Sequence, residues 1–451
     1  MKTKYVFLTL FLAALLILIS LLALRHFNHY PTLHSPEAYT HLRIAQLIHE
    51  NGILQFDSLL KQHYTFNLYD YLIAGLSLLA PLSLLSLLIP LLIGVAVAFL
   101  FYQILIKYCN SERTFYILFF FLLSPAYLYS FTTLTSLGFI AFLALLGFWL
   151  FLKQKMIWAY LTWALLVLTS WVAFITICLL FLWYLYTYEK NKIQSALHLF
   201  SLGFLFWILL IVTHPFNFQD QLLPFQLGLR YYLTDFGAMV GYSFVTFILC
   251  LIWLFKYWNK KPLVLLLVFL LSAINLPTRI LMSFMLSIGA GLYVANLSER
   301  NWQLSLLKQL TLLLIGCLIL FSALSYMHRL VQSPPELSLQ KALEKLSYEE
   351  KGAVLTSPEY SSFTAYFAHQ SLANLSQQDL STIYHSQRLD LTKKILDQYD
   401  VRYILITPSM RNGGVWNAPN QGLLLLLPFS ESFIKRNAVD DIEIWQYRGG
   451  S

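Results

Sequence analysis

Three ionisable side chains stand close together in the stretch from residue 34 to residue 60. They are Glu37, His41 and Arg43, in the string Glu-Ala-Tyr-Thr-His-Leu-Arg, and the apolar residues around them recur with the period of a helix. A carboxylate in the first turn of a helix just outside a bilayer can bind a divalent metal ion or act as a base. The alternative is that Glu37 only caps the start of the helix.

A second carboxylate, Asp235, lies near the end of the long stretch from residue 214 to residue 237, in the string Tyr-Leu-Thr-Asp-Phe-Gly. Together with Glu37 it would provide two carboxylates that could hold a metal ion or polarise an acceptor. The alternative is that Asp235 caps the apolar helix that we expect to begin near Gly237.

A single arginine, Arg279, lies at one end of a later apolar run, in the string Asn-Leu-Pro-Thr-Arg-Ile. A guanidinium inside a membrane is costly unless it is paired, so Arg279 is a candidate for holding a phosphate group attached to a lipid. Snorkelling of the side chain to the membrane surface is the alternative.

The composition is that of a membrane protein, so membrane-spanning helices must position these side chains. Hydrophobic residues make up 58% of the 451 residues and charged residues only 12%, against about 45–50% and about 25% in soluble domains. The net charge of +8 comes from small basic groups between apolar runs, a pattern that sets membrane topology and predicts no nucleic-acid partner. The four cysteines include no CxxC pair, so neither a disulfide framework nor a zinc ribbon is expected.

We predict eleven membrane spans, because a helix needs about 20 apolar residues to cross a bilayer. A further apolar stretch, 68–80, is too short to cross and should only dip into one face. This choice keeps the basic connections on the side of Lys2 and Lys4, the cytoplasm, and places the C-terminal part outside the cell. The predicted spans are 5–24, 84–106, 115–132, 137–152, 156–170, 171–188, 196–213, 238–255, 263–277, 280–297 and 309–327.

The chain therefore divides into a polytopic α-helical membrane domain and a small C-terminal α/β domain. The first comprises residues 1–328, with external loops at 25–83 and 214–237, and the second comprises residues 329–451. In the second domain, charged residues return and apolar runs have the length of strands. There we predict strands at 353–356, 401–407 and 442–447, a helix at 391–399, and a linker at Pro334 and Pro335.

The first-loop string resembles the first external loop of the catalytic subunits of oligosaccharyltransferases, particularly the archaeal members. It is followed, as in that family, by Ile-Ala-Gln-Leu-Ile-His-Glu-Asn-Gly and then by Phe56 and Asp57. The family belongs to the GT-C superfamily of membrane glycosyltransferases, so the resemblance implies a GT-C fold. It places Glu37 where the family has its first metal-binding aspartate.

Other family motifs are present only in part. Asp235 matches the glutamate that in the family lies near the metal ion and the acceptor asparagine, and Arg279 matches an arginine of a late span that binds the donor phosphate. The family's second acidic pair is replaced by Thr133, Thr135 and Ser136. Hydroxyl groups are weaker ligands than carboxylates, so a metal site would be weakened or lost.

The family's acceptor motif, Trp-Trp-Asp-Tyr-Gly, corresponds to Ser-Pro-Glu-Tyr-Ser at 357–361. Glu359 and Tyr360 match its acid and its tyrosine, but both tryptophans and the glycine are replaced. These two residues are the candidates for binding the acceptor, and the missing tryptophans argue against recognition of the usual glycosylation sequon.

The resemblance implies an enzyme of the cell membrane that transfers a glycan from a polyprenyl- or dolichyl-linked phosphate donor to an acceptor, a polypeptide or a glycan, on the external face. Glu37 and Asp235 would bind Mn²⁺ or Mg²⁺ and the acceptor, whereas Arg279, Arg43 and His41 would hold the donor phosphate. One alternative is a monosaccharide transferase whose acceptor is not a sequon. Another is a catalytically inactive, glycolipid-binding scaffold; a transporter is less favoured, because intramembrane ionisable residues are scarce.

Overall fold

The computed structural model describes residues 3–449 except 53–55, 65, 189–198, 200, 209–230, 257–271, 273–274 and 419–420. The chain forms two compact units. The first consists of residues 1–25 and 65–331, and the second of residues 26–64 and 332–451.

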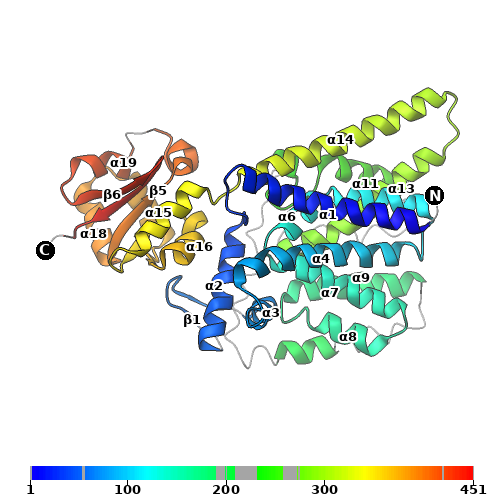
Figure 1. Ribbon diagram of the computed structural model, residues 1–451, viewed down its shortest axis with the longest axis horizontal. Coiled ribbons are helices and arrows are strands. Elements are labelled where there is room, and N and C mark those ends of the chain that lie inside the picture. The colour runs from blue at the N-terminus through cyan, green and yellow to red at the C-terminus, as the bar shows by residue number, and fades with distance from the viewer. Residues whose placement is uncertain are drawn as a thin grey trace. The chain divides into compact units, whose positions relative to one another are not determined.

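The first unit is helical, as the run of apolar residues predicts, and its long helices run roughly side by side (Figure 1). Its described helices are α1 Thr3–Phe27, α3 Leu68–Leu76, α4 Leu82–Leu105, α5 Ser111–Leu122, α6 Pro125–Thr132, α7 Ser136–Leu152, α8 Met156–Ala164, α9 Trp171–Tyr188, α11 Phe244–Lys256, α13 Leu276–Glu299 and α14 Ser305–Gln332.

Helix α13 packs closely against α5 and α11, and small residues line its face toward α5. Ser283, Ser287 and Gly291 follow one another at intervals of four residues, the spacing of one helical face. A Cβ atom on Gly291 would lie 2.5 Å from the Cα atom of Ile117 in α5, so only glycine allows this approach. Arg279 stands one turn before Ser283 on the same face.

In the part of the chain that the structure describes, three helical stretches are long and apolar enough to cross a membrane: α4, α13 and the stretch that begins at Ser305. The predicted single span at 115–132 is wrong in detail, because α5 and α6 are separate helices bent by 62°. Ser124 caps α6 and Pro125 opens it, which ends α5. The bent pair could form a fourth span, so the count of eleven stays a prediction.

The predicted span 263–277 lies largely outside the described residues, and half of the predicted span 196–213 does so. The short stretch 68–80 contains α3, a helix of 9 residues. At 1.5 Å per residue it is about 14 Å long, roughly half the thickness of the hydrocarbon core, in agreement with a segment that does not cross.

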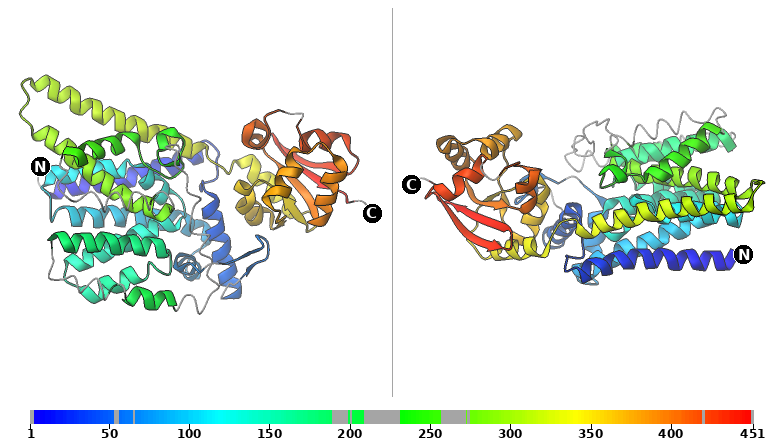
Figure 2. Two further views of the ribbon diagram at one scale, coloured as in Figure 1. Left: turned by 180° about the vertical axis from the view of Figure 1, so that it is seen from behind. Right: turned by 90° about the horizontal axis from the view of Figure 1, so that it is seen from above.

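The second unit is built on a five-stranded sheet in the order β4-β3-β5-β7-β6. Strand β3 is parallel to β4 and β5, and β7 is antiparallel to β5 and β6. Helix α15 packs against β6 and β7, and α18 packs against β5 (Figures 1 and 2). The bounds are β3 Ala353–Leu355, β4 Ser371–Leu372, β5 Val401–Ile406, β6 Phe433–Val439, β7 Ile442–Tyr447, α15 Leu337–Ser347, α17 Gln377–His385 and α18 Leu389–Gln398.

The predicted α/β composition of this region is confirmed, since the three predicted strands and the helix are β3, β5, β7 and α18. Strands β4 and β6 were not predicted. β4 has only two residues, and β6 is an edge strand that carries Lys435, Arg436 and Asn437 in place of an apolar run.

Most of the first loop belongs to this second unit. Its helix α2, Pro36–Asn51, is followed by the two short strands β1, Phe56–Asp57, and β2, Gln62–His63. The ring of Tyr39 in α2 packs against Phe363 and Phe367, with centroid distances of 5.2 and 5.0 Å. Residues 26–64 therefore fold with the C-terminal residues, whereas the sequence grouped loop 25–83 with residues 1–328.

Candidate functional site

The first turn of α2 brings Glu37 and His41 together. Ser35 caps the helix by accepting a hydrogen bond from the backbone N–H of Glu37, and Pro36 occupies the first helical position. One turn later, Nε2 of His41 lies 3.3 Å from Oε1 of Glu37. The Glu37 side chain is 33% exposed and that of His41 is 8% exposed, so the carboxylate faces solvent while the imidazole beneath it is buried.

Arg43 forms a buried ion pair with Asp57 of β1. Its Nε and Nη2 atoms donate to the two carboxylate oxygens of Asp57 at 2.8 and 2.7 Å, and the two side chains are 8% and 5% exposed. Its Nη1 donates to the carbonyl of Ala365 at 3.4 Å. The arrangement fixes α2, and with it Glu37, to the C-terminal part of the unit; a contact between Arg43 and a donor phosphate stays a prediction.

The charge of Asp57 is stabilised by its surroundings. Burial alone would raise the pKa of its carboxyl group, but the hydrogen bonds and the charge of Arg43, with backbone N–H groups of Leu59 and Leu60, outweigh burial and lower that pKa. Asp57 is therefore ionised at neutral pH. In the sequence, Asp57 stands out only as part of the resemblance, and nothing there indicates its ion pair with Arg43.

In the first unit, Asp235 makes the capping contact that the sequence raised as an alternative. Its Oδ2 accepts the backbone N–H of Phe244, at the start of α11, at 2.7 Å. Its Oδ1 accepts the hydroxyl of Ser322 on α14, also at 2.7 Å. The residue is nonetheless exposed, so the carboxylate is both positioned and accessible.

Arg279 supports the same loop from α13. Its Nε donates to the carbonyl of Ser272, and its Nη1 donates to the carbonyls of Tyr231 and Val240, at 2.9 to 3.0 Å. The guanidinium also lies 5.3 Å from the ring centre of Tyr232. Among the residues that the structure describes, its Nη2 has no hydrogen-bond partner, so this atom carries the prediction of phosphate binding.

Helix α14 completes the support of this loop. Tyr326 donates its hydroxyl to the carbonyl of Met239, and Arg329 donates to the carbonyl of Thr234. The loop from Tyr231 to Ser243 is thus held by side chains of two helices. This rigidity is suited to a carboxylate that must keep one position.

The threonines that replace the family's second acidic pair are buried. Thr133 and Thr135 have exposed fractions of 0% and 1%, and neither hydroxyl has a hydrogen-bond partner within the described part of the chain. Neither residue carries a charge. This turn therefore supplies hydroxyl groups and no carboxylate.

Four hydroxyl groups gather at the carboxyl ends of the parallel strands β3 and β5. Tyr360 is buried and its hydroxyl pairs with that of Ser409, which lies 3.2 Å from the hydroxyl of Thr407. The buried hydroxyl of Thr356 has no partner among the described residues. Ligands commonly bind at the carboxyl ends of two neighbouring parallel strands whose following connections lead to opposite sides of the sheet. Glu359 beside them is exposed.

Thr407 and Ser409 were not among the residues predicted from the sequence. The signal that could have found them is the string Thr-Pro-Ser directly after the buried strand β5. The predicted acceptor residues Glu359 and Tyr360 do lie together, one exposed and the other bonded inward.

The described residues do not form a complete metal site. No group of three or more histidine, cysteine, aspartate or glutamate side chains that could hold an ion is found among them. Glu37 and Asp235 belong to different units, so their pairing around a metal ion stays a prediction.

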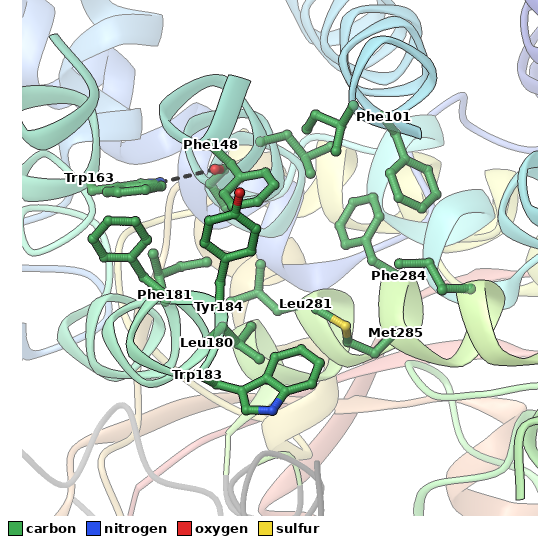
Figure 3. Close-up of a pocket in the computed structure, with 15 residues that line it drawn as sticks. Phe101, Phe148, Trp163, Leu180, Phe181, Trp183, Tyr184, Leu281, Phe284 and Met285 are labelled. Atoms are coloured by element: carbon green, nitrogen blue, oxygen red, sulfur yellow. Dashed lines mark hydrogen bonds between the residues drawn. The ribbon is translucent and has the colours of Figure 1, made fainter. Parts of the chain in front are cut away.

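An apolar pocket of about 150 Å³ lies among α4, α7, α8, α9 and α13 of the first unit (Figure 3). Aromatic side chains surround it, and Nε1 of Trp163 donates to the carbonyl of Ala144 at 3.0 Å. The described residues that line it include no ionisable acid or base except the hydroxyl of Tyr184. The pocket could hold hydrocarbon but offers no groups for catalysis.

No family model and no curated protein matches this sequence. Solved structures do match it. AglB, the oligosaccharyltransferase of Archaeoglobus fulgidus, in complex with an inhibitory peptide and a dolichol-phosphate, gives a TM-score of 0.64 at 12% identity, over 99% of this chain and 74% of that one. ArnT from Cupriavidus metallidurans, bound to undecaprenyl phosphate, gives a TM-score of 0.60 at 11% identity, over 99% of this chain and 98% of that one.

This chain has the fold of the oligosaccharyltransferase AglB and of ArnT. The fold that the first-loop resemblance implied is thereby confirmed. The Archaeoglobus enzyme has also been solved in complex with Zn and sulfate, at a TM-score of 0.61 and 12% identity.

Proposed function

We propose that this protein is a membrane glycosyltransferase that moves a glycan from a polyprenyl- or dolichyl-linked phosphate donor to an acceptor on the external face of the cell membrane. The observation that carries the proposal is the fold, shared over 99% of the chain with proteins solved with dolichol-phosphate and undecaprenyl phosphate. The exposed Glu37 carboxylate beside His41 supplies a base. We propose a polypeptide as the acceptor, with the N-terminus in the cytoplasm and residues 329–451 outside.

In the proposed reaction, an O–H or N–H group of the acceptor attacks the anomeric carbon of the donor. The bond between that carbon and the phosphate oxygen breaks, and the lipid phosphate leaves with the bonding electrons. Glu37 accepts the proton of the attacking group, and His41, 3.3 Å away, fixes the position of its carboxylate. A phosphate monoester is a stable anion at neutral pH, so the leaving group needs no proton.

The remaining residues position the substrates and stabilise charge, the two effects that supply most of the rate acceleration in such a reaction. Arg279, through Nη2, and also Arg43 and His41 would contact the donor phosphate. Asp235 would polarise the acceptor, and Glu359 and Tyr360 would orient it. A divalent ion would add charge at the phosphate; because the described residues form no complete metal site, no step here depends on one.

A second candidate is a monosaccharide transferase whose acceptor is not a sequon. It is favoured because Tyr360 bonds to Ser409 and because Ser357 and Pro358, in place of two tryptophans, precede Glu359. The catalytically inactive scaffold differs from both because it would bind a glycolipid without transferring its sugar.

The test is transfer by the purified protein from a lipid extract of its native membranes, with and without Mn²⁺. A sequon peptide, a shuffled peptide and lipid-linked glycans serve as acceptors. Glu37→Gln should lower the transfer rate by about 10²–10⁴-fold. Glu50→Gln, which changes an exposed acid of the same helix, should leave it unchanged.

Transfer to the sequon peptide alone would support the first candidate, and transfer only to a glycan or lipid would support the second. A Glu37→Gln variant as active as Glu50→Gln would refute the role of Glu37. Absence of transfer to every acceptor, with retained binding of the lipid, would indicate the scaffold.

A further inference from the structure

A second recognition site is indicated by a groove of about 670 Å³ within the second unit. Its volume is in the range of small-molecule sites, about 300–1,000 Å³. None of the residues that we assign to transfer lines it. It is formed by α2, α15, the end of β6 and the π-helix η6, Thr364–Ala368. The side chains that matter for recognition are Tyr348, Tyr366, Phe367, Lys341, Lys345 and His369.

Three aromatic side chains line this groove, those of Tyr348, Tyr366 and Phe367. Tyr348 is 91% exposed, an unusual position for a large ring. Tyr366 and Phe367 are held from behind by Tyr39 of α2, whose ring centre lies 5.2 and 5.0 Å from theirs. Edge-on and tilted packing of this kind fixes ring orientation.

The backbone that carries these rings has an uncommon conformation. η6 is a π-helix, a form that is found mostly in single turns and often at functional sites. It ends at His369, which has a φ of 49°, in the left-handed region that few residues other than glycine adopt. The carbonyl of His369 accepts a hydrogen bond from Nζ of Lys351 at 2.9 Å. Such conformations persist where the surroundings enforce them.

The groove also has a positive edge. Lys341 and Lys345 lie four residues apart on α15, on one face of the helix. Neither forms an ion pair within the described part of the chain. Glu344, between them, also lines the groove; its carboxylate accepts a hydrogen bond from Gln340 at 2.7 Å, and the two lysines leave this edge with a net positive charge. Burial, and then the charges of Lys351 and Arg43, lower the pKa of His369, so its ring is neutral at pH 7 and can donate and accept hydrogen bonds.

We infer that this groove binds a saccharide that carries carboxylate groups. The faces of sugar rings present C–H groups with a partial positive charge, which the negative face of the exposed Tyr348 ring attracts, while Tyr366 and Phe367 add apolar contact area. Lys341 and Lys345 pair with the carboxylates. Gln46 and Ser347, which also line the groove, supply hydrogen bonds for the hydroxyl groups. Two lysines beside the exposed ring of Tyr348 favour an acidic sugar over a chain of acidic residues, which has no ring to stack.

This inference concerns binding and does not require that the protein transfer sugars. The saccharide could be a soluble acceptor or the glycan of a lipid-linked donor, because both present the same chemistry. The two sources are distinguished by testing a free oligosaccharide and the same oligosaccharide joined to a polyprenyl phosphate.

The experiment measures binding to the full-length protein in nanodiscs. The soluble probes are tetragalacturonate, neutral cellotetraose and a tetraglutamate peptide, and the lipid probe is tetragalacturonate on polyprenyl phosphate. The variants are Tyr348→Ala and Lys341→Gln combined with Lys345→Gln. The matched controls are Phe429→Ala, which removes a ring that is 83% exposed, and Lys393→Gln combined with Lys394→Gln on α18.

We expect the double lysine variant to weaken tetragalacturonate binding by about tenfold or more, with no effect on cellotetraose. Tyr348→Ala should weaken binding of both sugars, and added salt should weaken only that of the acidic one. If the groove variants weaken binding of the free sugar, the natural ligand is a soluble acceptor. If they weaken binding of the lipid-linked sugar alone, the ligand is the glycan of the donor. The inference would be overturned if the groove variants bound free and lipid-linked tetragalacturonate as tightly as the control variants do. It would also be overturned if the unmodified protein bound tetraglutamate more tightly than tetragalacturonate.

Discussion

Replacing Asp57 with alanine should loosen the attachment of α2 within the second unit. The change removes the carboxylate that accepts two hydrogen bonds from Arg43, at 2.8 and 2.7 Å, and those from the N–H groups of Leu59 and Leu60. The guanidinium would remain buried without its partner. Because Arg43 also donates to Ala365, the effect should reach from α2 to η6.

The magnitude follows from the burial of the pair, whose side chains are 8% and 5% exposed. Breaking a buried ion pair by removing one partner costs about 3–5 kcal/mol. Since about 1.4 kcal/mol corresponds to a factor of ten, amide protection in α2 should fall by about 10²–10⁴-fold. Deleting both charges, by Arg43→Met with Asp57→Leu, should restore much of this protection, because no unpaired charge then stays buried.

The assay is hydrogen exchange followed by mass spectrometry on the full-length protein, read on peptides that cover residues 36–51 and 364–368. The control is Asp390→Ala, which removes the partner of Arg388 in a pair whose side chains are 73% and 71% exposed. Exposed pairs contribute little, so no change is expected. If Asp57→Ala altered exchange in α2 no more than Asp390→Ala does, the ion pair would not be what holds this helix.

Three further outcomes are expected. Because the folded-state pKa of Asp57 lies below its ordinary value of 3.8, its contribution to stability should be complete above pH 4 and decline only as the pH falls below that value, as exchange at graded pH would show. Gly147→Ala should lower the unfolding temperature, at a cost of about 1–3 kcal/mol, because its Cβ would lie 2.3 Å from Nε1 of Trp163; Gly316→Ala, with open space around it, should raise it slightly. Arg279→Ala should speed proteolysis of the loop at residues 231–243, because Arg279 donates hydrogen bonds to two backbone carbonyls of that loop. Unchanged cleavage would contradict this role of Arg279.

Local patterns in the sequence were enough for several elements. The apolar runs predicted most of the described helices, and strands β3, β5 and β7 with helix α18 appear where they were expected. The spacing of Glu37 and His41 already implied their contact, because residues four apart on a helix are neighbours. Such features depend on backbone hydrogen bonds between residues close in the chain, so the sequence alone determines them.

Other elements were hidden by their composition. The continuous apolar run from residue 115 to residue 132 concealed the break between α5 and α6, although Ser124 and Pro125 carry the signal for a new helix. Strand β6 was missed because it lies at the edge of the sheet, where charged side chains replace the apolar ones on which the prediction depends.

Only the tertiary structure decided which side chains act together. Arg43 meets Asp57 across 14 residues, Tyr360 meets Ser409 across 49, and Asp235 meets Ser322 across 87. It also decided that the first loop folds with the C-terminal residues, where α2 and η6 form one wall of the groove. Contacts between distant residues depend on how whole elements pack, which no periodicity along the chain records.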